Sequence, residues 1–185
     1  MKTNYWLNQN RFLSHLRLAT AMLLACSAAL SIAAPSTSEP NDKNADQTFS
    51  GTVSGTIPPP SAWGPPLPGT NGCVFSFPVP NSGQSNLLGQ FTGMATFMPN
   101  VCDNSYTGTY EWVAANGDRI SGPFRGQLIA TATPGVFNNF ETATIANGTG
   151  RFRHASGQFT LYGTIDFNTS TFVLPWLGTA SPNGH

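Results

Sequence analysis

Residues 158–167 are the segment that most limits what this chain can fold into. Their side chains alternate between two faces of different polarity. One face carries Phe159, Leu161, Gly163, Ile165 and Phe167, and the other carries Gln158, Thr160, Tyr162, Thr164 and Asp166. A period of two is typical of a β-strand with one buried and one solvated face. The segment therefore predicts a half-buried strand and argues against a helix.

The rest of the chain supports an all-β fold. Only 9% of the 185 residues are charged, against about 25% in an average protein, and the chain contains 19 glycines and 15 prolines. Turn signals recur about every ten residues and separate about eight candidate strands, which is typical of an antiparallel barrel or sandwich. Glycines inside the candidate strands suit a tightly coiled sheet that closes on itself. We expect a small eight-stranded antiparallel barrel, with an antiparallel β-sandwich as the alternative.

The N-terminal segment has the features of an export signal. Lys2, Arg11 and Arg17 precede an apolar stretch over residues 18–32, and small residues at 31–33 predict cleavage after Ala33. An alternative is a lipoprotein signal, because Leu-Leu-Ala-Cys at residues 23–26 would place a lipid on Cys26. The predicted domains are a signal peptide (1–33), a flexible leader (34–47) and one barrel domain (48–182). Either signal predicts an exported protein, periplasmic or extracellular, and membrane attachment only through a lipidated Cys26.

Charge and cysteine content limit the function classes. After residue 33 the chain keeps five basic and eight acidic side chains, a formal net charge of −3 without a basic face. This argues against nucleic-acid binding. Cys73 and Cys102 are a disulfide candidate in an exported chain, with two buried thiols as the alternative. Histidine and cysteine spacing predicts no metal site, and no cofactor fingerprint is present.

A proline-rich segment at residues 58–72 (PPPSAWGPPLPGTNG) does not fit a central strand or a helix. The simplest interpretation is a long surface loop. The functional alternatives are a proline-rich ligand for a partner or a flap over a pocket anchored by Trp63.

Asn116-Gly117 predicts a hairpin between two strands in residues 106–133. A two-residue turn would place Val113 opposite Ile120 and turn Glu111 toward the buried face that Ile120 and Phe124 share. The alternative is a bulge that reverses the faces, so that Glu111 lies at the surface and Trp112 in the core.

Glu141 is a second candidate for an interior carboxylate. It has the same parity as Ala143 and Ile145 in the strand expected at residues 136–146. The opposite assignment buries Val136 and Phe140 and exposes Glu141. Two carboxyl groups in an apolar cavity would have raised pKa values and could act as acid and base, so Glu111 and Glu141 are the candidate catalytic residues.

Six further residues are candidates for lining or orienting a ligand. They are Tyr106, Val113, Ile120, Phe124, Asn138 and Arg153. Arg151, Arg153 and His154 also form a local basic cluster, which is either a solvated turn or an anion clamp at the barrel mouth.

Three short motifs resemble one protein family. They are Asn-Leu-Leu-Gly-Gln-Phe-Thr at residues 86–92, Ala-Asn-Gly-Asp at 115–118, and Gly148-Thr-Gly150-Arg-Phe152 followed by Ala155-Ser-Gly157. The pattern is similar to the exported bacterial proteins of the allene oxide cyclase-like barrel superfamily, which includes the plant dirigent proteins. The resemblance implies an eight-stranded barrel with a hydrophobic cavity and no cofactor. Plant members cyclise an unsaturated epoxide or guide the coupling of phenoxy radicals. The matched residues are turn and packing positions, so the resemblance implies a fold more than a chemistry.

Three functions follow as hypotheses. The first is an exported barrel that binds a small hydrophobic ligand in its lumen. The second is a cofactor-independent isomerase or cyclase acting on an unsaturated lipid or a phenolic compound. The third is a structural envelope lipoprotein.

Overall fold

The computed structural model describes residues 46–182 of the chain, which fold into β-strands joined by loops and turns, with almost no helix. The predicted signal peptide, Cys26 and nearly all of the leader lie outside the described residues. The strands are β1 (Gln47–Thr56), β2 (Phe77–Ser85), β3 (Gly89–Pro99), β4 (Ser105–Ala114), β5 (Arg119–Ala130), β6 (Val136–Ile145), β7 (Asn147–Gly148), β8 (Ser156–Asp166) and β9 (Thr171–Ser181). Two short 3-10 turns, η1 (Pro60–Ala62) and η2 (Gly150–Phe152), are the helical segments of this range.

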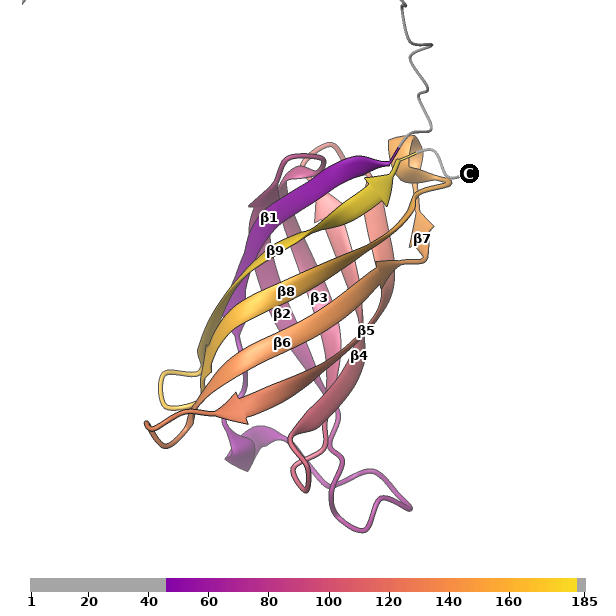
Figure 1. The fold of residues 1–185 in the computed structure, drawn as a ribbon. Coiled ribbons are helices and arrows are strands. Elements are labelled where there is room, and N and C mark those ends of the chain that lie inside the picture. Colours follow the sequence, from indigo (N-terminus) through magenta and orange to yellow (C-terminus); the bar gives the residue numbers. More distant parts are fainter. Residues whose placement is uncertain (1–45, 183–185) are drawn as a thin grey trace, which may run out of the picture. The chain divides into compact units, whose positions relative to one another are not determined.

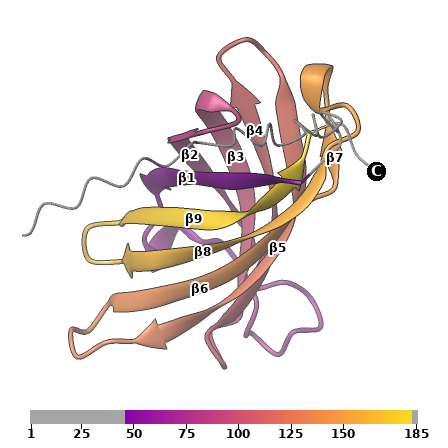
Figure 2. The same cartoon turned by 45° about the horizontal axis from the view of Figure 1, so that its top comes forward.

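Eight long antiparallel strands close into a barrel, as Figure 1 shows. Neighbouring strands follow the order β4-β3-β2-β1-β9-β8-β6-β5, and pairing of β4 with β5 closes the ring. The short strand β7 pairs with β5 beyond the last residue pair between β5 and β6. In Figure 2, β1, β9, β8 and β6 lie side by side in front of β2 and β3. The expected eight-stranded barrel is confirmed, and the sandwich alternative is wrong.

The hairpin between β4 and β5 has a longer turn than the two-residue prediction. The Ala114 amide donates to Asp118 O, and the Gly117 amide donates to Ala114 O, with Gly117 at a φ of 87°. These bonds define a three-residue loop with a left-handed glycine, which shifts the pairing by one residue. Val113 therefore lies opposite Arg119, and Trp112 lies opposite Ile120. The bulged alternative is confirmed: Trp112 is in the core, and Glu111 lies on the outer face.

Glycines inside the strands give large rings room in the lumen. Eight inward aromatic side chains each lie opposite a glycine on the neighbouring strand. The pairs are Gly51–Trp176, Gly55–Phe172, Gly83–Phe91, Gly93–Trp112, Phe124–Gly108, Tyr110–Gly122, Tyr106–Gly126 and Phe159–Gly178. At most of these glycines an added Cβ atom would lie 2.2–2.7 Å from the side chain of the paired aromatic residue. At Gly178 the added atom would lie 2.4 Å from Phe159 Cα, and at Gly122 it would meet the backbone of β6. The glycine pattern therefore lets a narrow barrel accept so many rings.

One end of the barrel is filled by an aromatic plug, defined here as Phe49, Phe91, Trp112, Phe159 and Trp176. These rings come from five strands and lie near the start of β1, the end of β9 and the β4–β5 turn. The Trp112 and Trp176 ring centroids are 4.9 Å apart, and those of Phe49 and Phe159 are 5.1 Å apart. All five side chains are buried. Burial of this much aromatic area makes the plug a major part of the single apolar core that the buried residues form.

The predicted glycine motif at residues 148–157 connects β7 to β8 at the same end. Phe152 and Ala155 are buried, and Gly150 adopts a φ of 56° against the Asp118 side chain. Arg151 Nε lies 3.3 Å from Asp118 Oδ2. Gly148, Gly150, Phe152, Ala155 and Gly157 thus act in the packing of a connection.

At the opposite end, the proline-rich loop carries Trp63 over the barrel. The Trp63 ring stacks on Phe77 at 4.9 Å and contacts Phe75 and Phe167 edge-on, while its Nε1–H donates to Pro58 O at 2.7 Å. Because Phe77 in turn contacts Phe97 in the lumen wall, Trp63 forms the outer layer of a cap at this end. We call this the capped end.

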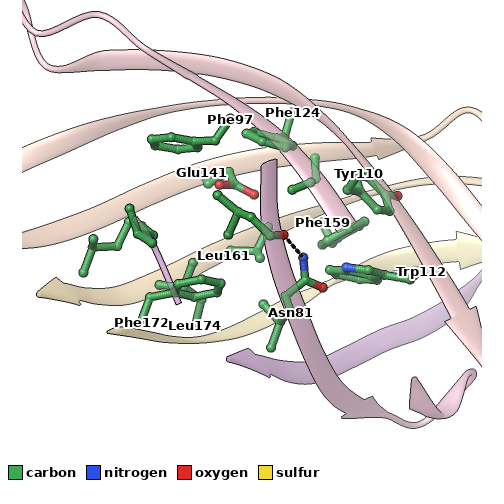
Figure 3. A pocket seen from close by; sticks show the side chains of 16 residues that line it. Asn81, Phe97, Tyr110, Trp112, Phe124, Glu141, Phe159, Leu161, Phe172 and Leu174 are labelled. Carbon is green, nitrogen blue, oxygen red and sulfur yellow. Dashed lines mark hydrogen bonds between the residues drawn. The ribbon is translucent and has the colours of Figure 1, made fainter. Parts of the chain in front are cut away.

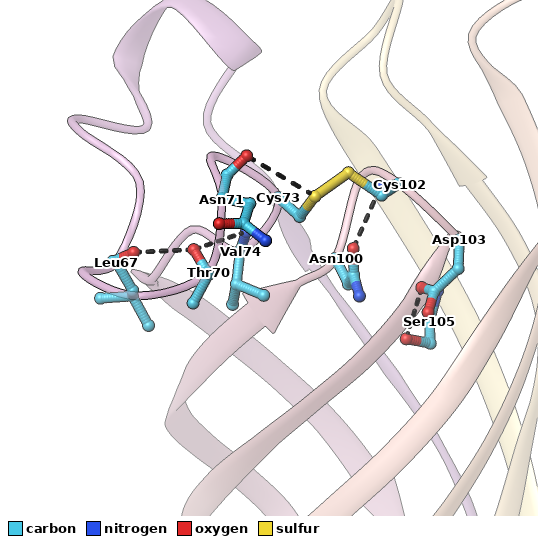
Figure 4. The surroundings of a disulfide bond; sticks show 9 residues. All are labelled: Leu67, Thr70, Asn71, Cys73, Val74, Asn100, Cys102, Asp103 and Ser105. Carbon is cyan, nitrogen blue, oxygen red and sulfur yellow. Dashed lines mark hydrogen bonds between the residues drawn. A yellow bond between two sulfur atoms is a disulfide. The ribbon is translucent and has the colours of Figure 1, made fainter.

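The predicted disulfide between Cys73 and Cys102 is present at the capped end, with the two Cα atoms 5.4 Å apart (Figure 4). It joins the C-terminal part of the proline-rich loop to the β3–β4 connection. The Val101 amide donates to Cys73 O, and an isolated bridge pairs Val74 with Asn100 beside the disulfide. The alternative of two free thiols is wrong for this structure.

Candidate functional site

A cavity of about 60 Å³ lies inside the barrel between the aromatic plug and the capped end. Its walls are aliphatic and aromatic, with contributions from β1, β2, β3, β4, β5, β6, β8 and β9. The side chains labelled in Figure 3 are Asn81, Phe97, Tyr110, Trp112, Phe124, Glu141, Phe159, Leu161, Phe172 and Leu174. Glu141 is the one ionisable carboxyl group in this wall.

Glu141 faces the lumen because of the parity of β6. Asn139, Ala143 and Ile145 point the same way and are buried, whereas Phe140 points outward with 61% of its surface exposed. The sequence assignment that groups Glu141 with Ala143 and Ile145 is confirmed, and the assignment that buries Phe140 is wrong. The lumen therefore contains a carboxyl group from the middle of a strand.

Tyr106 reaches Glu141 across a glycine. Tyr106 on β4 pairs with Gly126 on β5, and Gly126 pairs with Glu141 on β6, so the three residues form one row across the sheet. A Cβ atom on Gly126 would lie 2.2 Å from the Tyr106 hydroxyl oxygen. Because glycine leaves that space free, the Tyr106 hydroxyl passes over β5 and lies 3.0 Å from Glu141 Oε2.

The same hydroxyl also contacts Asn139 Oδ1, so a single hydrogen faces two acceptors. With this amide orientation both contacts are satisfied when Glu141 is protonated, because the carboxyl group then donates to Tyr106 and Tyr106 donates to Asn139. Asn139 is 1% exposed, and its Nδ2 has no hydrogen-bond partner among the described residues. The polar network is therefore incompletely satisfied in an otherwise apolar wall.

Burial changes the acidity of the network. Removal from water raises the pKa of Glu141 to about 7, although the Tyr106 hydrogen bond acts in the opposite direction. Burial also raises the pKa of Tyr106 and of Tyr110, and the negative charge of Glu141 adds to both shifts. Glu141 is therefore the group of the lumen that changes its charge near neutral pH.

The other predicted catalytic residue does not join this site. Glu111 lies on the outer face of β4, where its Oε1 is 3.0 Å from Arg119 Nη1 and both side chains are 51% exposed. The expectation of an interior Glu111 is wrong, because the three-residue turn reversed the parity of β4. The structure does not bring Glu111 and Glu141 together.

The predicted ligand-lining residues divide between the two faces of the wall. Phe124 lines the cavity, while Tyr106 and Ile120 are buried but do not line it. Asn138 and Arg153 are exposed, and Val113 lies on the outer face. Val113, Asn138 and Arg153 are therefore outside the lumen in this structure. Val113 and Asn138 point outward because they occupy the outward-facing positions of β4 and β6.

Two further polar residues of the lumen, Asn81 and Asn139, were not among the residues that the sequence patterns predicted. Asn139 is the neighbour of the predicted Asn138 and occupies the inward position of β6. Asn81 on β2 lines the cavity, where its Nδ2 donates to Val79 O at 3.1 Å and its Oδ1 accepts no hydrogen bond from the described residues. For Asn139 the signal was available, since it has the parity of Glu141.

Residues 46–182 bring together no group of three or more histidine, cysteine, aspartate or glutamate side chains that could hold a metal ion. Within the same residues, no helix is long and apolar enough to cross a membrane.

Comparisons with known proteins assign no family to this chain. No family model matches the chain, and no curated protein matches it. The chain is similar to one solved structure that the comparison found, that of the pterocarpan synthase dirigent protein GePTS1. It shares 14% sequence identity over 82% of this chain and 98% of that chain, with a TM-score of 0.43. What this chain does is therefore argued from its own residues.

Proposed function

We propose that this chain is an exported β-barrel protein that binds a small, largely apolar molecule in its lumen, with Glu141 as the polar contact. The observation that carries the proposal is the position of Glu141. A carboxyl group inside an apolar wall destabilises the fold unless something compensates for its burial. Titratable groups placed at such a cost are concentrated at functional sites.

The size of the cavity limits what fits without rearrangement. Its volume of about 60 Å³ is smaller than the ~150 Å³ of an engineered cavity that binds benzene. A ligand larger than a few non-hydrogen atoms therefore needs side chains of the wall or the cap to move. Trp63 and the rings below it are the layer whose displacement would lengthen the cavity toward solvent.

The disulfide supports the export part of the proposal. Disulfides form and persist in oxidising compartments and are rare in the reducing cytosol. The bond between Cys73 and Cys102 is compatible with a periplasmic or extracellular location. The choice between cleavage after Ala33 and a lipid on Cys26 is tested by the intact mass of the mature protein.

Native mass spectrometry of the protein purified from its own host tests the ligand. We expect a small molecule to co-purify with the wild-type chain and with Glu111→Gln, since Glu111 lies on the outer face. Glu141→Leu should reduce or abolish co-purification. Equal ligand occupancy in Glu141→Leu and the wild type would contradict a role for this carboxyl group.

A second candidate function is a cofactor-independent isomerase or cyclase. It is favoured by the same carboxyl group, because an acid with a pKa of about 7 can both donate and accept a proton near neutral pH. With Glu111 on the outer face, Glu141 would act with Tyr106 rather than in a pair of carboxylates. Turnover of the co-purified molecule that is unchanged in Glu141→Gln would exclude this mechanism. The third hypothesis, a structural envelope protein, is the outcome if no ligand is found.

A further inference from the structure

We propose that the lumen selects a small organic amine, held as its ammonium ion against Glu141 and the surrounding rings. The inference rests on the proposed function, because it presumes that the lumen takes up a ligand, and it names the chemical class of that ligand. It follows from the hydrogen-bonding groups, the charges and the rings that the wall presents.

The wall offers free hydrogen-bond acceptors. Tyr106 contacts Oε2 of Glu141, and no hydrogen bond from the described residues reaches Oε1. Asn81 provides another acceptor, since its Oδ1 is without a partner while its Nδ2 is used by Val79 O. An ammonium group has three donors and no acceptor, so it complements such a wall better than a hydroxyl group with its single donor.

The wall offers no positive charge that could pair with an ionised Glu141. The titratable groups facing it are Tyr106 and Tyr110 on β4, and the cross-strand neighbours are Gly126 on β5 and Leu161 on β8. The cavity residues from β1, β2, β3 and β9 carry no charge. Arg125, next to Gly126, is exposed on the outer face of β5. An ionised Glu141 therefore lacks a positively charged partner within the described chain, and a bound cation would supply one.

Six aromatic rings complete the chemical match. Phe97, Tyr110, Trp112, Phe124, Phe159 and Phe172 line the same cavity as Glu141. The faces of aromatic rings attract cations, most strongly when water is excluded. The methylene groups of an alkylamine would contact the aliphatic and aromatic wall, while its ammonium group contacts the carboxylate. The cavity volume of about 60 Å³ suits a short alkyl chain.

Amine binding should be coupled to the ionisation of Glu141. The pKa of Glu141 lies at about 7, whereas alkylammonium groups, like lysine, lose their proton near ~10.4. Between these values the carboxylate and the ammonium ion coexist. Below pH 7, protons compete with the amine, so its affinity should fall about tenfold for each pH unit.

Calorimetric titration with propylamine and butylamine, against 1-propanol and 1-butanol as uncharged controls of matched size, tests the proposal. At about pH 8 we expect the amines to bind the wild type at least about tenfold tighter than the alcohols, because a hydrogen bond between two charged groups is stronger than one to a neutral hydroxyl group. The preference should decline toward about pH 6, vanish in Glu141→Gln, and persist in Glu111→Gln.

The outcomes separate the inference from the function on which it rests. If the alcohols bind as tightly as the amines, the lumen takes up ligands but the amine preference is wrong. If no probe binds the wild type, both the preference and the lumen site for molecules of this size are wrong. If Glu111→Gln rather than Glu141→Gln abolishes amine binding, the amines bind the outer face and the inference is overturned. Because glutamine keeps the size of glutamate and removes its charge, Glu141→Gln should fold.

Discussion

The two ends of the barrel use the same packing device for different results. At the aromatic plug, rings such as Trp176 and Trp112 lie opposite Gly51 and Gly93 and pack against one another. Toward the capped end, Tyr106 lies opposite Gly126 in the same way, but its hydroxyl group meets a carboxyl group beside a cavity. The plug therefore provides stability, whereas the other half gives up packing to hold a titratable group.

The largest expected effect is on stability, when one aromatic ring of the plug and one ring of the cavity wall are each replaced by alanine. Trp176→Ala should lower the free energy of unfolding by about 3–5 kcal/mol, because its buried ring contacts four others and would leave a large void. Phe172→Ala, at the cavity wall, should cost no more than about 3 kcal/mol, since open space already borders its ring. Urea denaturation of both variants measures the difference. Equal losses would mean that the two halves are packed alike.

The capped end depends on a covalent link where the other end depends on packed rings. Replacing both Cys73 and Cys102 by serine should lower the free energy of unfolding by about 3–4 kcal/mol, given a sequence separation of 29 residues. The bond joins loops outside the lumen wall, so the pH dependence of stability should remain. Thermal unfolding over a pH series measures both quantities, and a changed pH profile would show that the disulfide also shapes the lumen.

The carboxyl group should make stability fall with rising pH. The folded pKa of Glu141, about 7, lies above the ordinary 4.5, so between these values the unfolded chain releases a proton that the folded chain retains. Glu141→Gln removes this fall. As the pH rises from about 4 to about 8, the free energy of unfolding of Glu141→Gln should therefore increase by about 2–3 kcal/mol relative to that of the wild type. The matched control is Glu111→Gln on the outer face. Parallel pH profiles of the wild type and Glu141→Gln would contradict the burial of this charge.

The smallest effect tests the glycine that lets Tyr106 cross β5. Gly126→Ala should cost about 1–3 kcal/mol, because the new methyl group collides with the Tyr106 hydroxyl and with Phe140 O. The Tyr106 Cζ atom would lie 2.3 Å from the same methyl carbon, so the background variant must remove the ring as well as the hydroxyl. In a Tyr106→Ala background both collisions with Tyr106 are absent, and the cost of Gly126→Ala should be smaller. A double-mutant cycle measures this coupling. Additive costs would show that Gly126 does not make room for Tyr106.

The contrast between the two carboxylates also shows what the sequence could predict. The period-two pattern of residues 158–167 was sufficient to predict a half-buried strand, because alternation is a local property, and the recurring strand glycines favoured a barrel over a sandwich. They were insufficient at Glu111, because Asn-Gly occurs in two-residue and in three-residue turns, and the extra residue reverses every side chain of β4. The parity of β6 was likewise open until the pairing with β8 was known. The Tyr106–Glu141 contact joins strands that are not neighbours, which no single-strand pattern specifies.

The most direct test of this account is a ¹³C NMR titration of the Glu141 carboxyl carbon, with Glu141→Gln used to assign the signal. We expect a midpoint near pH 7, because the carboxyl group is held in the lumen without a positive partner. A midpoint in the ordinary range, near 4.5, would contradict this expectation, because Glu141 would then face water or a counter-charge.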